Sequence, residues 1–285
     1  MSTKRPDRVC WLRIGQVVQR FSQSFMESQN PMIVERPQES THWYAKDGSP
    51  AYTVTAKNGE QRNTTLRDAK KMGLLPSVTT IMKAAASPGL EAWKLNQMML
   101  AALTLPRAEG EGEESFIKRI QADSKDHARK AAERGTQVHT AIEQFFDGQI
   151  NANDLPYLEP VYKAVNDTFG NLMWAVEKSF AAESGFAGKV DLHSRDGEGV
   201  VADFKTKEFT TESLEKVTGF DENVMQLAAY RAGLAITKAR CANVFVSVTE
   251  PGLVVTKEWS EEDLERGEEM FYHLLKYWQA KNKHT

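Results

Sequence analysis

Apolar and small side chains recur at steps of three and four between residues 117 and 145, which is the spacing of one face of a long helix. The positions are Ile117, Ile120, Ser124, Ala128, Ala131, Gly135, Val138, Ile142 and Phe145. Asp147 and Gly148 follow directly and are typical of a helix stop. A second helix is expected over 158–174. The pattern therefore predicts two consecutive helices in the middle of the chain.

Beyond residue 174 the apolar period falls from helical spacing to alternation, which favours strands. Three strands are expected over 175–182, 186–193 and 200–206, and two further strands over 243–249 and 253–259. Helical spacing returns between the two groups, over 223–238, and Ser260 is placed to cap a last amphipathic helix. This order of helices and strands predicts an α/β fold.

Shorter signals precede this region. Aromatic and turn residues alternate around Asp47 and Gly48, which predicts a small hairpin over 43–54. Ser77 is placed to cap a short helix, and a second short helix is expected to carry Leu90, Trp93 and Met98. The acidic, glycine-containing stretch over 108–114 lacks apolar periodicity and is interpreted as an internal linker.

The first 31 residues have a composition of their own, rich in serine and in basic residues at Lys4, Arg5, Arg8, Arg13 and Arg20. This is typical of an organelle transit peptide, whereas Arg13 interrupts the apolar region that a secretory signal needs. Met32 begins a segment that also resembles the start of a protein chain. We therefore expect a peripheral extension over 1–39, a mainly helical region over 40–107 and a core over 108–285, in a cytoplasmic protein. Organelle targeting is the alternative.

Composition narrows the class of protein. The 285-residue chain is 41% hydrophobic, enough to bury a sizeable core. It has no run of 18 apolar residues, so no membrane partner is expected. A net charge of -3 gives no general attraction for phosphate, and nucleic-acid binding would need a local basic face. Cys10 and Cys241 are too few for a disulfide framework or a thiolate-bound iron-sulfur cluster, and a reducing compartment fits best.

The segment from Gly185 to Lys207 carries the candidate chemistry. If its turn centres on Gly197, Asp191 lies opposite Asp203 in an antiparallel ladder, with side chains on the same face. Lys205 shares that face. The other face would present an apolar set for packing on helices: Val190, Leu192, Val200, Ala202 and Phe204.

Two opposed carboxylates repel each other unless a cation or proton compensates, and oxygen ligands at this spacing suit Mg²⁺ or Mn²⁺. Such an ion activates water and polarises a phosphodiester, while a nearby lysine stabilises developing charge. This indicates hydrolytic phosphodiester chemistry. The alternative is an amphipathic hairpin with a solvated charged face, on which Lys189 and Lys205 balance the aspartates.

Three further features flank the hairpin. His139 lies on the long helix near its apolar stripe, where a packed histidine is the simpler interpretation. Gln226 and Tyr230 are four residues apart on the next helix, so both side chains project from one face. Glu177, on the strand before the hairpin, is a further candidate carboxylate, and Glu183 competes with it.

Taken together, these elements resemble the RecB-like branch of the PD-(D/E)xK nucleases. That branch has a GxxxH-type helix, a G-x-x-D strand, a D-x-K strand and a Q-x-x-x-Y helix. They correspond here to Gly135 to His139, Gly188 to Asp191, Asp203 to Lys205 and Gln226 to Tyr230. The segment LPSVTTIMKAAASPGLEAWK is further similar to the N-terminal motif of mitochondrial genome maintenance exonucleases and their bacterial and phage relatives. The resemblance covers residues 40–260.

The resemblance implies a restriction-endonuclease-like core, a central mixed sheet flanked by helices, with a mainly helical N-terminal region. It implies that Asp191 and Asp203 coordinate Mg²⁺ or Mn²⁺, that His139 and the Phe204 carbonyl contribute ligands, and that Lys205 assists catalysis. From its place on the strand before the hairpin, Glu177 is expected as a further catalytic carboxylate. Gln226 and Tyr230 would support the site and contact nucleic acid. The iron-sulfur cluster of some relatives needs four cysteines and is not expected.

The long helix also offers a basic face leading toward His139, formed by Lys118, Arg119, Lys125, Arg129, Lys130 and Arg134. Backbone contacts of this kind would hold DNA without regard to sequence, which suits an exonuclease. The alternative is a solvated helix face on which these residues pair with Asp123, Asp126 and Glu133.

We therefore expect a metal-dependent deoxyribonuclease, an exonuclease acting on single-stranded ends in phage or bacterial DNA recombination, replication or repair. One alternative is a structure-specific endonuclease of the same superfamily. Another is a catalytically inactive DNA-binding or assembly protein that keeps the fold. A monomer and a homo-oligomer are both compatible with the sequence.

Overall fold

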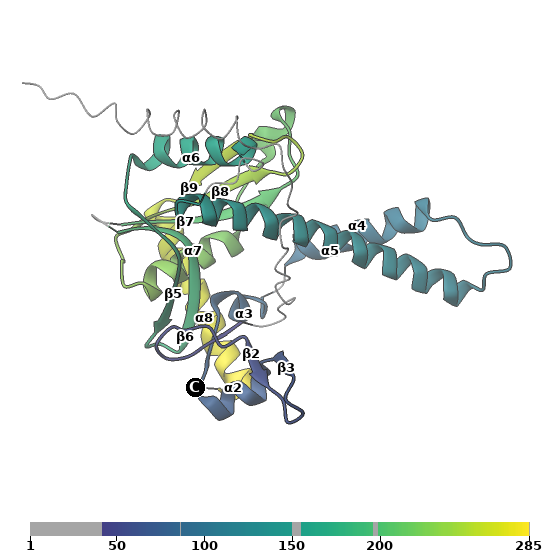
Figure 1. Cartoon of the computed structure of the whole chain (residues 1–285), viewed down its shortest axis with the longest axis horizontal. Coiled ribbons are helices and arrows are strands. Elements are labelled where there is room, and N and C mark those ends of the chain that lie inside the picture. Colours follow the sequence, from purple (N-terminus) through teal and green to yellow (C-terminus); the bar gives the residue numbers. More distant parts are fainter. Residues whose placement is uncertain (1–41, 86, 150–154, 196–198, 285) are drawn as a thin grey trace, which may run out of the picture. The chain divides into compact units, whose positions relative to one another are not determined.

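The structure, a computed structural model, describes residues 42–85, 87–149, 155–195 and 199–284 (Figure 1). The predictions for the first 41 residues, targeting included, lie outside the described residues. Residues 39–285 form one unit. None of the helices within the described ranges has the length and apolar character needed to cross a membrane.

A five-stranded mixed sheet lies at the centre of this unit, in the order β5-β6-β7-β8-β9. The β7–β8 pair is parallel and the other neighbours are antiparallel. The strands are β5 Trp174–Ala182, β6 Phe186–Ser194, β7 Val200–Lys207, β8 Arg240–Ser247 and β9 Val254–Glu258. The predicted α/β class and the predicted strands are confirmed.

Helices cover both faces of the sheet. On one face α5 (Glu113–Phe146) and α6 (Leu155–Phe169) pack against alternate residues of β7, from Val200 to Phe204. On the other, α7 (Asp221–Gly233) and α8 (Glu261–Asn282) pack with Val201 in a second apolar cluster. A central strand buried on both faces explains why β7 is apolar at nearly every position before its site residues.

The predicted apolar face of the hairpin needs one correction. Leu192 packs on the α5 and α6 side with the β7 residues, whereas Val190 packs in the cluster on the α7 and α8 side. The β5–β6 ladder is interrupted between them, where Glu177 has a left-handed φ of 52°. The change of side between Leu192 and Val190 therefore falls at the position where this ladder lacks a pair.

The N-terminal part of the unit holds two short ladders. The predicted turn is present, since the amide of Ala45 donates to Ser49 O at 2.8 Å and Tyr44 bridges Pro50. The ladder partner of β1 (Trp43–Tyr44), however, is β4 (Leu75–Pro76), while β2 (Thr53–Thr55) pairs with β3 (Gln61–Asn63). The amide of Ala51 also donates to Trp43 O at 2.8 Å, so the expected hairpin is confirmed over 43–51, and β4 is a second, distant partner of β1.

Short helices complete this region. Thr65 caps α2 (Leu66–Met72). Ser77 caps α3 (Val78–Met82) through a 3.0 Å hydrogen bond from the amide of Thr80, as predicted.

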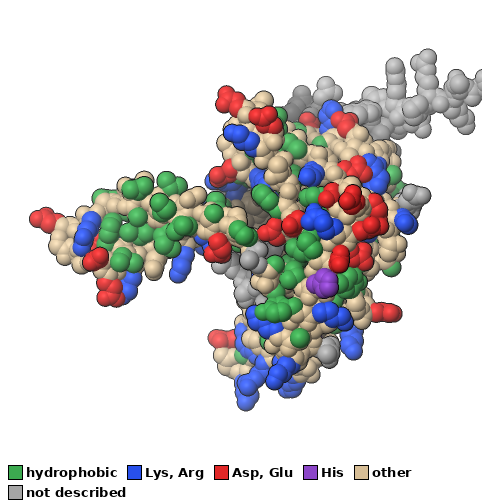
Figure 2. All heavy atoms as spheres, turned by 180° about the vertical axis from the view of Figure 1, so that it is seen from behind, with side chains coloured by type: hydrophobic (Ala, Val, Ile, Leu, Met, Phe, Trp, Pro, Cys, Tyr) green, Lys and Arg blue, Asp and Glu red, His purple; other side chains and the backbone are tan. Residues whose placement is uncertain are grey.

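The next helix, α4 (Pro88–Thr104), packs along the first half of α5, and the predicted linker is the short connection between them (Figure 1). The apolar residues Leu95, Met99 and Leu103 remain exposed on α4. Hydrophobic side chains gather over this pair of helices in Figure 2.

Two helices end earlier than their apolar spacing predicts. α6 ends at Phe169 because Gly170 has a φ of 81°, and Trp174 already belongs to β5. α7 ends at Gly233, followed by Ala235 with a φ of 58°. A left-handed residue of this kind terminates a helix. The predicted stop after α5 is confirmed, since Asp147 caps the helix and Gly148 has a φ of 86°.

Candidate active site

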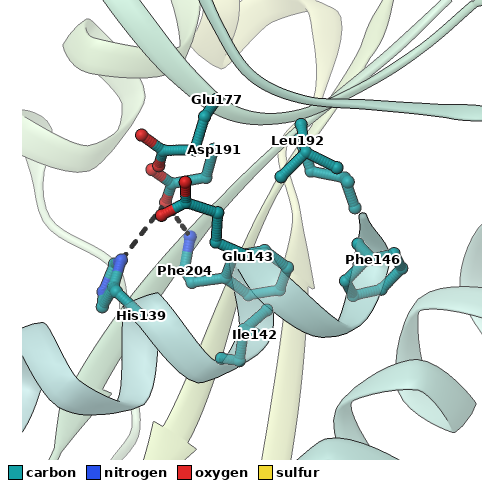
Figure 3. Close-up of a pocket in the computed structure, with 9 residues that line it drawn as sticks. His139, Ile142, Glu143, Phe146, Glu177, Asp191, Leu192 and Phe204 are labelled. Atoms are coloured by element: carbon teal, nitrogen blue, oxygen red, sulfur yellow. Dashed lines mark hydrogen bonds and ion pairs between the residues drawn. The ribbon is translucent and has the colours of Figure 1, made fainter. Parts of the chain in front are cut away.

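A polar pocket lies between α5 and the sheet, where β6 separates from β7 (Figure 3). His139 and Glu143 enter it from α5, one helical turn apart. Glu177 enters from β5 and Asp191 from β6, while Phe204 of β7 closes it. The remaining lining is apolar and consists of Ile142, Phe146, Val176 and Leu192.

Strand register sets the acidic residues in one row. Leu192 pairs with Ala202 and His193 with Val201, so one further step in the same register places Asp191 opposite Asp203. The β5–β6 register places Glu177 opposite Asp191 in the same way. The paired residues of the β6–β7 ladder have the register expected for the two aspartates, and both ladders lack a pair at the positions of the three carboxylates themselves.

Asp191 lies at the fork between β6 and β7. Its Oδ2 accepts a 2.9 Å hydrogen bond from the amide of Phe204 and lies 3.6 Å from His139 Nδ1. Burial, followed by the negative charge of Asp203, raises the pKa of the Asp191 carboxyl. Its contact with Phe204 is made by the backbone amide of that residue, whereas the predicted metal ligand is the carbonyl.

Asp203 is 2% exposed, and its two polar side-chain contacts are both made by one of its carboxylate oxygens. Its Oδ2 lies 2.7 Å from Lys205 Nζ and accepts a 2.9 Å hydrogen bond from Asn243 Nδ2. Lys205 Nζ also donates to Gln226 Oε1 at 2.9 Å. Asp203 is thus withdrawn from solvent and Asp191 is half-buried, which differs from a solvated charged face, although Lys205 does pair with Asp203 as that alternative expects.

Gln226 and Tyr230 of α7 form the support of Lys205. Gln226 Nε2 donates to the Tyr230 hydroxyl at 2.8 Å, which leaves Gln226 Oε1 to accept from the lysine. Burial, together with Asp203 and Asp191, raises the pKa of Tyr230 well above its ordinary value, so the phenol stays protonated. Both side chains are buried, and the Tyr230 ring also packs against Phe180 with ring centroids 6.0 Å apart.

The glycines of the GxxxH and G-x-x-D motifs lie where neighbouring helices and strands approach each other closely. A Cβ on Gly135 would lie 2.9 Å from Thr206 Oγ1, so this glycine lets α5 approach β7 one turn before His139. A Cβ on Gly188 would lie 2.8 Å from the Phe180 ring and 3.1 Å from Tyr230. Each of the two motif glycines therefore lies where a larger side chain would clash with a neighbouring element.

Among the carboxylates, the structure separates Glu177 from Glu183. Glu177 lines the pocket and forms an ion pair with Lys189, whereas Glu183 is exposed in the β5–β6 turn. Glu143 also lines the pocket and is not among the predicted site residues. Its signal was the spacing of four residues from His139, which puts both side chains on one face of the helix.

The basic face of α5 is largely engaged in ion pairs within the helix. Arg129 contacts Asp126 at 2.5 Å and Glu133 at 2.6 Å, and Lys130 contacts Asp126 at 2.9 Å. Exposed ion pairs of this kind match the alternative interpretation of this face, in which its basic residues are solvated and pair with acidic neighbours. Arg134 and Lys125 differ, because both are exposed and have no ion pair within the described part of the chain.

Comparisons with known proteins add little. No protein-family model and no curated protein matches the chain. Similar solved structures include the crystal structure of SSO0001, which is 15% identical, covers 65% of this chain and 86% of that chain, and has a TM-score of 0.28. A likeness this weak supports no conclusion about function.

Proposed function

We propose that this chain is a Mg²⁺- or Mn²⁺-dependent nuclease that hydrolyses phosphodiester bonds of DNA from single-stranded ends, in recombination, replication or repair. The observation that carries the proposal is the pair of buried Asp203 and half-buried Asp191, each one position beyond the Leu192–Ala202 pair of adjacent strands, with Lys205 on the second strand. Like charges so placed are destabilising unless a cation compensates. We also propose a restriction-endonuclease-like core, supported by a mixed sheet that carries this pair beside α5.

The residues present fit a hard divalent cation. Asp191, Asp203 and His139 would hold it, with Glu143 and Glu177 close by in the pocket. Nowhere in the described ranges do three His, Cys, Asp or Glu side chains already form a metal-binding group. Lys205 contacts Asp203 at Oδ2 alone, whereas Lys189 pairs with Glu177, so Glu177 would have to exchange this partner before it could join the ligands. When bound, such an ion supplies activated water and polarises phosphate.

Lys205 is the residue placed to stabilise charge on a scissile phosphate. An ammonium has three N–H donors, and two of those on Lys205 face Asp203 and Gln226. The third remains for a phosphoryl oxygen that gains charge in the transition state. Exposed Arg134, five residues before His139 on α5, offers a contact for the DNA backbone.

End-labelled linear single-stranded DNA, incubated with Mg²⁺ or Mn²⁺, tests the proposal. Wild-type protein is compared with Asp203→Asn and Lys205→Ala, and EDTA serves as the metal control. Asp167→Asn, in an exposed ion pair of α6, is the matched control variant. We expect metal-dependent shortening of the DNA by wild type and control, and a loss of at least 100-fold in both site variants with folding intact.

Further substrates separate the alternatives. Cleavage of circular single-stranded DNA by the wild type would indicate an endonuclease in place of an exonuclease. Stable DNA binding without cleavage of linear, circular or duplex substrates would replace the proposal with a catalytically inactive binding protein.

A further inference from the structure

Asn243 is a fully buried amide in the middle of β8, between Ala242 and Val244. Burying an amide costs free energy unless its polar atoms are hydrogen-bonded. Both are: Nδ2 donates to Asp203 Oδ2 at 2.9 Å, and Oδ1 accepts from Trp259 Nε1 at 2.8 Å. The parallel β7–β8 register pairs Asn243 directly with Asp203.

The two partners fix which way the amide points. An indole N–H only donates and a carboxylate only accepts, so the amide oxygen must face Trp259 and the amide nitrogen must face Asp203. A reversed amide would lose both hydrogen bonds. Asn243 therefore presents a donor to the carboxylate in one orientation.

Trp259 is itself held in place. It follows β9, is 8% exposed, and its amide donates to Cys241 O at 2.9 Å. Lys257 Nζ lies 4.3 Å from the ring centroid, and a Cβ on Gly219 would lie 2.5 Å from Cζ2 of the ring. Rotation of the indole is blocked on the side of Gly219, so the donor to Asn243 stays aligned.

The consequence falls on Asp203. Its Oδ2 is occupied by Asn243 and Lys205 together. Its Oδ1 accepts no hydrogen bond from any residue that the structure describes, and its lone pairs remain for another ligand. A carboxylate tied at one oxygen by two donors also loses the freedom to rotate.

We propose that Asn243, aligned by Trp259, is a positioning residue that fixes Asp203 Oδ2 beside Lys205 and leaves Oδ1 to bind the divalent ion. The inference rests on the proposed function, and neither residue belongs to the motifs that suggested it. Asn243 acts through Asp203 and does not itself touch the reacting groups.

Mn²⁺ binding to the full chain, measured by calorimetry, tests the role without relying on activity. The variants are Asn243→Leu, which keeps the volume but removes the hydrogen bonds, and Trp259→Phe, which removes the indole donor. Ser247→Ala is the matched control. Ser247 is fully buried on the same strand and donates to Phe209 O at 2.6 Å, away from the site.

We expect Asn243→Leu to weaken Mn²⁺ binding about 10-fold or more, Trp259→Phe by a smaller factor, and Ser247→Ala not at all. DNA cleavage by Asn243→Leu should recover at high Mn²⁺ with an unchanged KM for DNA. Wild-type Mn²⁺ affinity in folded Asn243→Leu would overturn the inference alone. If Asn243→Leu does not fold, wild-type Mn²⁺ affinity in Trp259→Phe would overturn the inference in its place. Failure of the wild type to bind Mn²⁺ would overturn the proposed function and this inference with it.

Discussion

At the scale of single residues, the site is governed by where charge is buried. Asp191 and Asp203 share a small volume with His139 and Lys205, and each carboxylate has one basic neighbour. Hydrogen bonds to the charged form offset part of the desolvation cost of an aspartate, here from the Phe204 amide and from Asn243. For Asp191 the free-energy cost of desolvation is larger than the gain from its hydrogen bond. The charged carboxylate therefore lowers the stability of the folded protein.

Replacement of Asp191 by asparagine should therefore stabilise the folded protein at neutral pH in EDTA. A carboxyl whose pKa is raised in the folded state favours folding when protonated, so the wild type loses stability as pH rises from 3.8 through the raised pKa. Each pKa unit corresponds to about 1.4 kcal/mol. Urea unfolding across this pH range should show a gain for Asp191→Asn that disappears in acid. A difference independent of pH would contradict the assignment.

At the scale of elements, two close approaches position the site. α5 approaches β7 at Gly135, and β6 approaches β5 and α7 at Gly188, where the Phe180 ring fills the space that a side chain would take. Phe180 also lies against Gly233 of α7, where a Cβ would be 2.0 Å from its ring. The ring therefore links β5, β6 and α7 below the pocket.

Gly188→Ala should lower the free energy of unfolding by about 1–3 kcal/mol, because the new methyl group overpacks against Phe180. Phe180→Leu in the same chain should recover part of the loss, which a double-mutant cycle measures. Gly89→Ala in α4 is the control, since nothing lies within 4 Å of its Cβ, and it should gain up to about 1 kcal/mol. Equal effects at both glycines would argue against the close approach.

The charged face of α5 leads to a different prediction. Arg134 should contribute more to DNA binding than Arg129, whose guanidinium is shared by Asp126 and Glu133. In an Asp203→Asn background that does not cleave, Arg134→Gln should reduce the slope of log affinity against log salt by about 1. Arg129→Gln should change the slope less. The opposite order, measured by fluorescence anisotropy on single-stranded DNA, would place the DNA path elsewhere.

At the scale of the whole unit, metal binding and folding should be linked. An ion bound by β6 and β7 joins strands that pair directly at only two positions, Leu192 with Ala202 and His193 with Val201. A ligand that binds the folded state alone stabilises it in proportion to the logarithm of its concentration.

Mn²⁺ at about 100 times its Kd should therefore raise the free energy of unfolding of the wild type by about 2.7 kcal/mol over EDTA. Asp203→Asn should gain much less, whereas the exposed Asp167→Asn should respond as the wild type does. The measurement is thermal unfolding at matched ionic strength. An equal gain in all three proteins would indicate that Mn²⁺ binds away from Asp203.

The sequence by itself determined the local structure and the register of the hairpin. Alternating and helical periods, turn residues and caps act between near neighbours, so β5 to β9, α5 and the Ser77 and Ser260 caps could be predicted, with Asp191 opposite Asp203. Tertiary structure decided the rest, including the pairing of β1 with β4, the choice of Glu177 over Glu183, and the entry of Glu143 into the pocket. Asn243 meets Asp203 across 40 residues of chain, through a parallel strand pair whose register no local pattern encodes.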